Sequence, residues 1–222
     1  MASAQVPAPR FATGRFADLV ALSERRLSDA FGGRIARLYG FGIAGSYGLA
    51  LLLLSSRAET ILSQALIALS WIPAGLVALG AARDQARLDD ENGFVALVRQ
   101  RGFDARDLEL ARFYATALRI ARITGWPALA LVLLHASRAR GLDTLLSAGF
   151  TALGAGVYVL CLSVLLAALA RASAIVSGGR GRVTLLAFVL IPHLAHSLFP
   201  SLPSVPRMLG NILRIFFERG GG

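Results

Sequence analysis

The chain has 222 residues, of which 55% are hydrophobic and only 16% are charged. Soluble globular domains average about 45–50% apolar and about 25% charged residues, so this composition argues against a soluble enzyme. The net charge of +10 comes from 23 basic residues, all of them arginine, against 13 acidic residues. A single cysteine, Cys161, excludes a disulfide framework and a cysteine-based zinc site.

The N-terminal region, residues 1–37, is charged throughout and lacks the continuous apolar core of a cleavable signal peptide. Over residues 14–37, apolar side chains recur at near-helical spacing with charged side chains between them. This pattern predicts an amphipathic helix that lies on the inner membrane surface. We expect residues 1–37 to form a cytoplasmic tail and an interfacial helix, with Gly32-Gly33 as a bend before the membrane domain.

The membrane domain is predicted from windows without charge, because a membrane-spanning helix needs about 20 apolar residues. Four windows within residues 38–199 reach or nearly reach that length, and a fifth is extended by a helical pattern that leads into it. A soluble bundle is the alternative, but its helices would carry polar stripes. We predict an all-α polytopic membrane helix bundle with interfacial amphipathic helices and about five transmembrane helices, at 38–56, 60–81, 113–136, 145–170 and 183–199.

The only sizeable cytoplasmic loop is expected at residues 82–112. Within it, acidic residues lie early and arginines late over residues 88–101, an order that suits the dipole of a short helix. Gly102 is then a natural helix stop, and Asp104 is placed to cap the helix that leads into the third span. A short amphipathic helix between two spans is a surface that another protein can bind. The alternative is a helix that lies on the lipid surface.

The C-terminal segment, residues 200–222, begins with prolines that break the fifth span. About 12 helical residues follow and reach only about 18 Å, which is too short to cross a bilayer. We predict an interfacial or re-entrant amphipathic helix with Ile212 and Phe216 in apolar contact. Its polar stripe, expected to face water or headgroups, consists of Arg207, Asn211, Arg214 and Glu218.

The arginines predict the orientation of the chain. Segments 1–37, 83–122 and 171–182 hold 17 of the 23 arginines, whereas the segments that alternate with them, 57–59, 138–143 and 207–219, hold 6. Arginine-rich loops stay in the cytoplasm, so we expect a multi-pass protein of the bacterial inner membrane with a cytoplasmic N-terminus. Because membrane topology and attraction to anionic lipid account for the basic charge, nucleic acid is not an expected partner.

His193 and His196 form an H-x-x-H pair in the expected fifth span. Two imidazoles on one helix face can bind metal or relay protons, and an intramembrane enzyme is therefore one functional alternative. No acidic residue lies inside an expected span to complete such a site. We therefore assign no catalytic residue, no metal ligand and no cofactor, and we expect the histidines to hydrogen-bond between helices.

The expected loop is similar to that of the permease subunits of exporter-type (type 2) ABC transporters. The loop of those permeases has an acidic residue, a glycine two positions later and spaced apolar residues, and a helix follows. The matching residues of this chain are Glu91, Gly93, Phe94 and Leu97, followed by a helix over 106–112. The chain departs from the family pattern in having five expected spans rather than six, and in having Phe103-Asp104 where the family has a proline.

The resemblance implies a homodimeric or heterodimeric permease subunit in contact with membrane lipid, which moves a lipid-like or hydrophobic substrate. It also implies a separate ATP-binding subunit, because this chain has no glycine-rich phosphate loop with a lysine. A non-transporting scaffold or accessory subunit is the alternative from another class. The coupling-helix residues that the resemblance implies for partner binding are Asp90, Glu91, Gly93, Phe94, Leu97, Arg99 and Arg101.

The arginine distribution leads to a test of orientation. Cysteine introduced as Arg57→Cys or Arg140→Cys is expected to react with a membrane-impermeant thiol reagent in whole cells, because both positions are predicted to lie outside. Arg87→Cys is expected to stay unlabelled until the membrane is opened. Labelling of Arg87→Cys in intact cells would reverse the orientation.

Overall fold

The computed structural model describes residues 13–29, 33–54, 58–83, 93–138, 141–196 and 204–217. Every regular element within these ranges is helical, so the all-α prediction is confirmed. The elements are α1 (Thr13–Asp29), α2 (Gly33–Leu53), α3 (Ala58–Leu69), a π-helical segment (Ser70–Ala74), α4 (Gly75–Ala81), α6 (Phe94–Gln100), α7 (Ala105–Ala136), α8 (Leu142–Ser177), a 3₁₀ turn (Gly178–Arg180), α9 (Gly181–Ala195) and α10 (Val205–Phe217).

Four of the helical runs are long and apolar enough to cross a membrane, namely Arg34–Leu53, Ala58–Ala81, Ala105–Ala136 and Leu142–Ser177. The protein is therefore a multi-pass membrane protein. The expected fifth span differs, because α9 has only 15 residues and ends at Ala195. Fifteen residues reach about 22 Å, which is less than the roughly 30 Å hydrocarbon core. The expected continuation beyond 196 lies outside the described residues.

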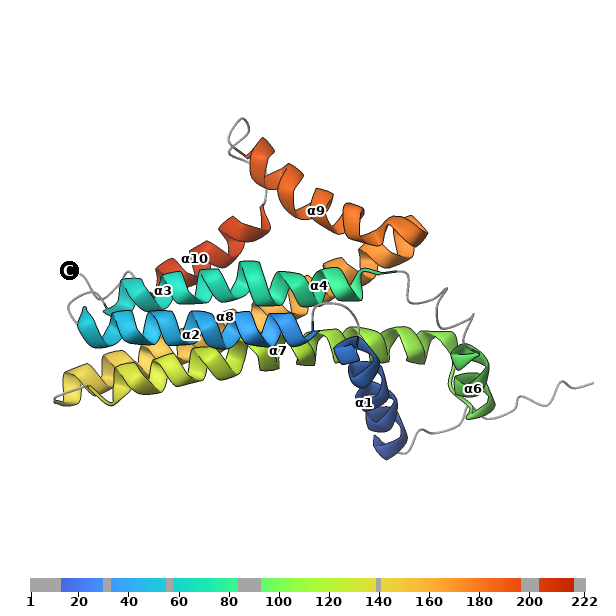
Figure 1. The fold of residues 1–222 in the computed structure, drawn as a ribbon, viewed down its shortest axis with the longest axis horizontal. Coiled ribbons are helices and arrows are strands. Elements are labelled where there is room, and N and C mark those ends of the chain that lie inside the picture. Colours follow the sequence, from blue (N-terminus) through green and yellow to red (C-terminus); the bar gives the residue numbers. More distant parts are fainter. Residues whose placement is uncertain are drawn as a thin grey trace, which may run out of the picture.

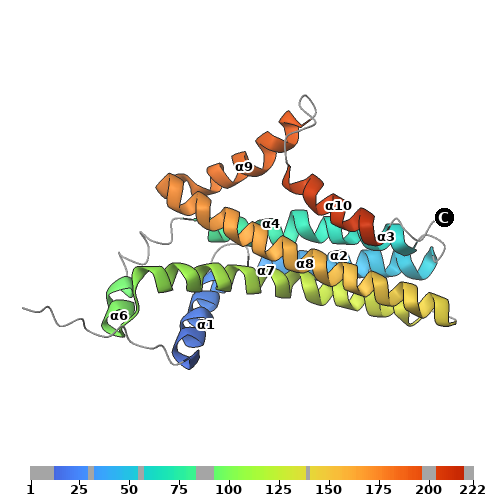
Figure 2. The same cartoon turned by 180° about the vertical axis from the view of Figure 1, so that it is seen from behind.

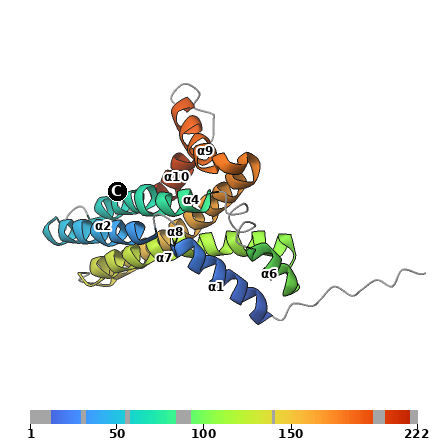
Figure 3. The same ribbon diagram turned by 45° about the vertical axis from the view of Figure 1, so that its right-hand side comes forward.

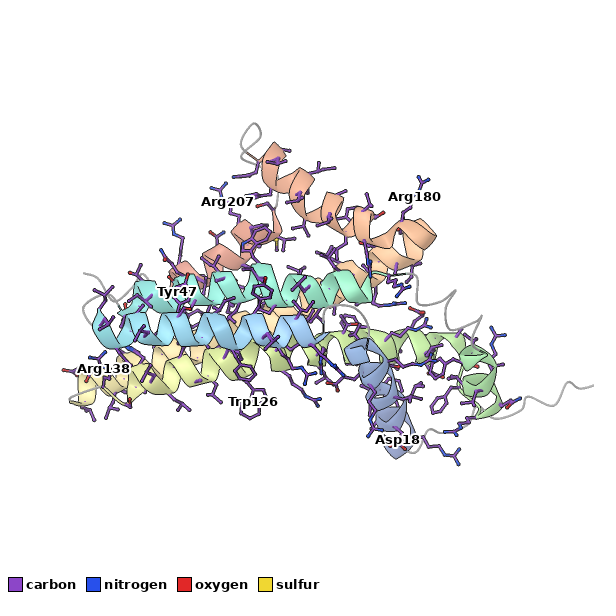
Figure 4. The ribbon with its side chains drawn as sticks, viewed as in Figure 1. Asp18, Tyr47, Trp126, Arg138, Arg180 and Arg207 are labelled. Carbon is purple, nitrogen blue, oxygen red and sulfur yellow. The ribbon has the colours of Figure 1, made fainter. Side chains whose placement is uncertain are left out.

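The long helices share one axis (Figure 1). Helices α2 and α7 run in one direction, and α3–α4 and α8 return in the other. Helices α1 and α6 lie at one end of this bundle, and α10 ends near the opposite end, as the reverse view also shows (Figure 2). Among the described arginines, Arg138 and Arg180 lie at opposite ends of the bundle (Figure 4).

Helix α1 crosses the bundle axis beside the part of α7 that extends past the other spans (Figure 1). Its buried face consists of Leu19, Val20, Ser23 and Leu27. An ion pair of 2.6 Å between Glu24 and Arg122 joins it to α7. The predicted helix over 14–37 is thus two helices, because α1 ends at Asp29 and residues from Gly33 onward belong to α2.

Helices α7 and α8 form the centre of the bundle and are in more extensive contact than any other pair in the described structure. At the end nearest α6, the carboxylate of Glu109 accepts hydrogen bonds from Arg112 on its own helix and from Arg171 on α8. Both arginine side chains are buried. The shared carboxylate balances part of their charge, which removal from water would otherwise make costly.

Glycines permit close helix contacts at a few positions. A Cβ on Gly40 would lie 3.2 Å from the carbonyl oxygen of Ile123 on α7, and one on Gly154 would lie 2.5 Å from Phe216 on α10. The Gly40 contact is a close approach of two helix backbones, which is a source of helix association in lipid. By contrast, a Cβ would meet nothing within 4 Å at Gly42, Gly45, Gly149 or Gly156.

Helix α10 confirms the predicted amphipathic C-terminal helix within the described residues. Arg207, Asn211 and Arg214 are exposed, and Ile212 and Phe216 pack against the core, whereas Glu218 lies outside the described residues. The helix has 13 residues and does not form a full span. It lies alongside α3 and α8 rather than beyond the end of the bundle, so the re-entrant alternative fits its placement (Figure 2).

Helix α9 is attached to the bundle at its beginning and diverges from it afterwards (Figure 3). A Cβ on Gly181 would lie 2.1 Å from the carbonyl oxygen of Ala82, which shows how closely the start of α9 meets the end of α4. The guanidinium Nε of Arg182 also donates to the carbonyl oxygen of Leu79 at 3.2 Å. This contact fixes the position from which α9 leaves.

Gly181→Ala is expected to destabilise the protein by about 1–3 kcal/mol, because the new methyl group meets backbone that cannot move aside easily. Gly156→Ala is the matched control in α8, where a Cβ meets nothing within 4 Å. A helical Gly→Ala change at such an open site gains roughly 0.5–1 kcal/mol. The measurement is thermal unfolding in one detergent, and equal stability of the two variants would contradict the close contact.

Candidate functional site

A mainly apolar cavity of about 690 Å³ lies between α9, α10 and the bundle. Its walls come from the π-helical segment and α4 on one side, α8 on a second side, and α9 and α10 on the third. Pockets of about 300–1,000 Å³ with mostly apolar walls are typical of small-molecule sites. Its lining includes Ser70, Trp71, Leu76, Tyr158, Leu162, Leu185, Val189, His193 and Leu209.

The π-helical segment interrupts the second span where it faces this cavity. Pro73 lies within the segment and has no backbone N–H to donate. The backbone N–H of Gly75 reaches only to the carbonyl oxygen of Ile72, so the regular hydrogen-bond ladder is broken here. Segments of this kind are frequent at functional sites, and three of its five residues line the cavity.

The polar contact of the cavity wall joins Ser70 to Tyr158 on α8. The Ser70 hydroxyl donates to the carbonyl oxygen of Leu66 at 2.7 Å. Since this uses the Ser70 proton, the Tyr158 hydroxyl donates to Ser70 Oγ at 2.6 Å. Tyr158 is 2% exposed, so the pair ties the second span to α8 within the packed interior. Both residues line the cavity, with His193 and a majority of apolar side chains.

The two histidines have different neighbours. The His193 ring lies against Trp71, with 6.3 Å between the ring centroids, and both residues line the cavity. Nδ1 of His196 lies 3.5 Å from Nη1 of Arg207 at the start of α10. Over the described residues, no three His, Cys, Asp or Glu side chains gather into a group that could hold a metal ion.

Only residues 93–101 of the coupling helix predicted over 88–101 are described by the structure. The described helix is α6, Phe94–Gln100, where 88–101 was expected. Asp90 and Glu91 lie outside the described residues. Gly93 precedes the helix with φ +67°, a conformation that favours glycine. Arg99 and Arg101 are exposed, so their predicted contact with a partner stays a prediction.

Phe94 lies inside the protein rather than on the surface that the prediction required. It is 8% exposed and packs in a cluster with residues of α1 and α7. The guanidinium of Arg26 lies 3.8 Å from its ring centroid and covers it, an arrangement that attracts a cation to the ring face. Leu97, one turn further along, is 44% exposed and remains available to a partner.

The two predicted boundaries after α6 are confirmed. Gly102 has φ +82° where α6 stops. Asp104 precedes α7, and its backbone N–H donates to the Asp107 carboxylate at 2.9 Å in a capping box. Such a box satisfies backbone groups that a helix start leaves without partners, and it fixes the residue at which α7 begins.

No protein-family model matches the chain, and no curated protein or solved structure matches it either. The structure thus defines the class, a multi-pass helical membrane protein with a cavity at the side of its bundle. The sequence contained one signal for this cavity, the proline at position 73 within an apolar window. Nothing in the sequence joined that window to Tyr158 on a helix 88 residues away.

Tyr158→Phe is expected to lower stability by about 0.5–1.5 kcal/mol, because it removes a buried hydrogen bond but leaves Ser70 its bond to Leu66. Ser70→Ala is expected to cost a similar amount, and the double variant less than the two single costs together. Thermal unfolding of the four proteins in one detergent measures this coupling. Additive losses would show that the two hydroxyls do not stabilise each other.

Proposed function

We propose that this chain is the membrane permease subunit of an ABC-type transporter in a bacterial inner membrane. It binds a hydrophobic or lipid-like substrate in the cavity beneath α9 and α10, and a separate ATPase chain drives it from the cytoplasm. The cavity is the observation that carries the proposal, because it combines an apolar lining with a buried hydroxyl pair along the spanning part of the bundle.

The helices on one side of the cavity support the proposal that this side moves. Two short helices, α9 and α10, close this side in place of one continuous span. Helix α9 is held through Gly181 and Arg182, and most of its large apolar residues are exposed. A change in the angle of α9 about Gly181 would separate His193 from Trp71 and so open the cavity, as alternating access requires.

The end of the bundle with α1 and α6 supports the proposal that a partner ATPase causes this movement. Helices α1 and α6 pack on the extension of α7 through a second apolar cluster, formed by Leu19, Val20, Phe94, Val98, Phe103, Leu108, Ala111 and Ala115. Helix α7 has 32 residues in all, about 48 Å, so it carries on past this cluster into the bundle, with Pro127 inside its second half. A push on α6 would pass along α7 to α8, which packs against it and lines the cavity.

The same proposal includes an orientation in the membrane and an assembly of two chains. The arginine-rich end, with α1 and α6, lies in the cytoplasm where the ATPase works. Two permease chains, identical or different, form the pathway between them, and the exposed apolar surface of α2 and α8 is available for lipid or for the second chain. The scaffold alternative shares this architecture but needs neither ATP hydrolysis nor substrate binding.

The experiment is mild-detergent purification of the full chain from its native membrane, followed by identification of a copurified chain with a phosphate-binding loop. ATP hydrolysis is then measured with that chain alone and with wild-type permease. Leu97→Ala is expected to weaken the complex by about 1–3 kcal/mol, roughly 5- to 150-fold, because Leu97 is the large apolar residue of α6 that is exposed. Stimulated hydrolysis is expected to fall with it.

Leu110→Ala is the matched control, because Leu110 is a leucine of α7 with a similar exposed fraction, 41%. This variant is expected to bind and stimulate the ATPase like wild type. Phe94→Ala tests the fold instead, and it should loosen α1 and α6 from α7. If no ATP-hydrolysing chain copurifies, or if Leu97→Ala and Leu110→Ala behave alike, the scaffold alternative replaces the transporter.

A further inference from the structure

A second hollow adjoins the apolar cavity, between α3 and α10. Its volume is about 360 Å³, and we call it the polar groove. Ile67 and Gly210 line both hollows, so the groove begins where the cavity ends. The polar residues of its lining are Glu59, Thr60 and Ser63 on α3 and Arg207, Asn211 and Arg214 on α10.

The charges of the polar groove sit beside a membrane span. Two arginines face one glutamate, which leaves a formal charge of +1, and the Glu59 carboxylate also accepts a hydrogen bond from Ser147 at 3.2 Å. Arg207 lies near the beginning of α10 (Figure 4) and lines the polar groove. Charged residues at the level of a bilayer usually face a cavity and mark a ligand pathway. The amphipathic character of α10 therefore has a reason beyond the membrane surface.

We infer that the cavity and the polar groove together bind one anionic amphiphile, an apolar chain that carries a phosphate or carboxylate group. The chain lies in the cavity, and the anionic oxygens lie against Arg207 and Arg214. Guanidinium groups bind such oxygens through paired, charge-assisted hydrogen bonds. The inference rests on the proposed function for the role of this amphiphile as transport substrate, and it names the class of that substrate.

The division of polarity between the two hollows selects this ligand class. A purely apolar ligand would fill the cavity but would make no polar contact with the positively charged groove. A free anion would meet the arginines but leave the apolar walls of the cavity unused. A ligand with both parts matches both hollows, and it has to pass Gly210 and Ile67, which line the junction.

The chain contains its own reporter for this binding, because it has two tryptophans in different surroundings. Trp71 lines the cavity. Trp126 is 65% exposed and projects from α7 on the side away from α9 and α10 (Figure 4). Trp126→Phe leaves Trp71 as the reporter of the cavity, and Trp71→Phe leaves Trp126 as the reporter of the surrounding detergent.

The experiment titrates the full chain in an uncharged detergent with phosphatidylglycerol that carries brominated chains, which quench tryptophan fluorescence. Phosphatidylcholine with the same chains is the zwitterionic comparison. In the Trp126→Phe protein, quenching of Trp71 is expected to saturate, at concentrations about tenfold lower for phosphatidylglycerol. The Trp71→Phe protein is expected to show weak, non-saturating quenching that is equal for the two lipids.

Two pairs of variants locate the ligand. Arg207→Gln/Arg214→Gln is expected to remove the tenfold preference, whereas Arg106→Gln/Arg180→Gln, at the opposite end of the bundle, keeps it. Gly210→Leu is expected to abolish saturable quenching, because a Cβ there meets nothing within 4 Å and the side chain fills the junction. Gly149→Leu, at an equally open position on α8, is expected to bind like the parent protein.

Four results would overturn the inference. Equal titrations with the two lipids would remove the polar groove from the site. Complete competition by inorganic phosphate would show a free-anion site. Identical curves for Trp71 and Trp126 would show unspecific partition. Absence of quenching in a dimeric protein would place a second copy over the cavity. Saturable lipid binding without any ATPase partner would leave this inference standing and refute the transporter proposal alone.

Discussion

The antiparallel packing of α7 against α8 is the contact on which the rest of the structure depends. Between helices in lipid there is little hydrophobic drive, so van der Waals contact between closely fitting faces has to hold them together. Ile120 and Ala128 on α7 and Ala155 and Leu162 on α8 belong to one buried apolar cluster, and Glu109 joins both helices at one end. Helices α1, α2 and α6 then pack on α7, and α9 and α10 pack on α8.

The asymmetry of this arrangement explains why the cavity lies at the side of α8. The α2 side of the bundle is covered by a helix of 21 residues, but the α8 side is covered by two short helices that meet at an angle. Two straight short helices cannot follow the surface of a long one over its whole length, so space remains under them. The π-helical segment widens the second span at the same level, and it adds Ser70 and Trp71 to the wall.

Phe94 connects α6 to the rest of the protein from a buried position, and not as an exposed residue that contacts a partner. Buried between α1 and α7 and covered by Arg26, it makes α6 part of the same packed unit as α7. The apolar anchor of a small interface usually carries much of its binding energy, and in α6 the exposed candidate for that role is Leu97. Force transmission and partner contact are thereby divided between two residues of one short helix.

The sequence by itself determined the helical class, four of the spans, the amphipathic character of α1 and α10, and the helix boundaries at Gly102 and Asp104. These features are local, because in lipid each span has to satisfy its backbone hydrogen bonds within itself, and caps involve residues only a few positions apart. Hydropathy also predicted a fifth span, which α9 does not reach within the described residues. Only the tertiary structure decided that Phe94 is covered, that Ser70 meets Tyr158, and that an apolar cavity adjoins the polar groove. Amphipathic spacing tells which residues share a face, but what covers that face depends on contacts between helices far apart in the chain.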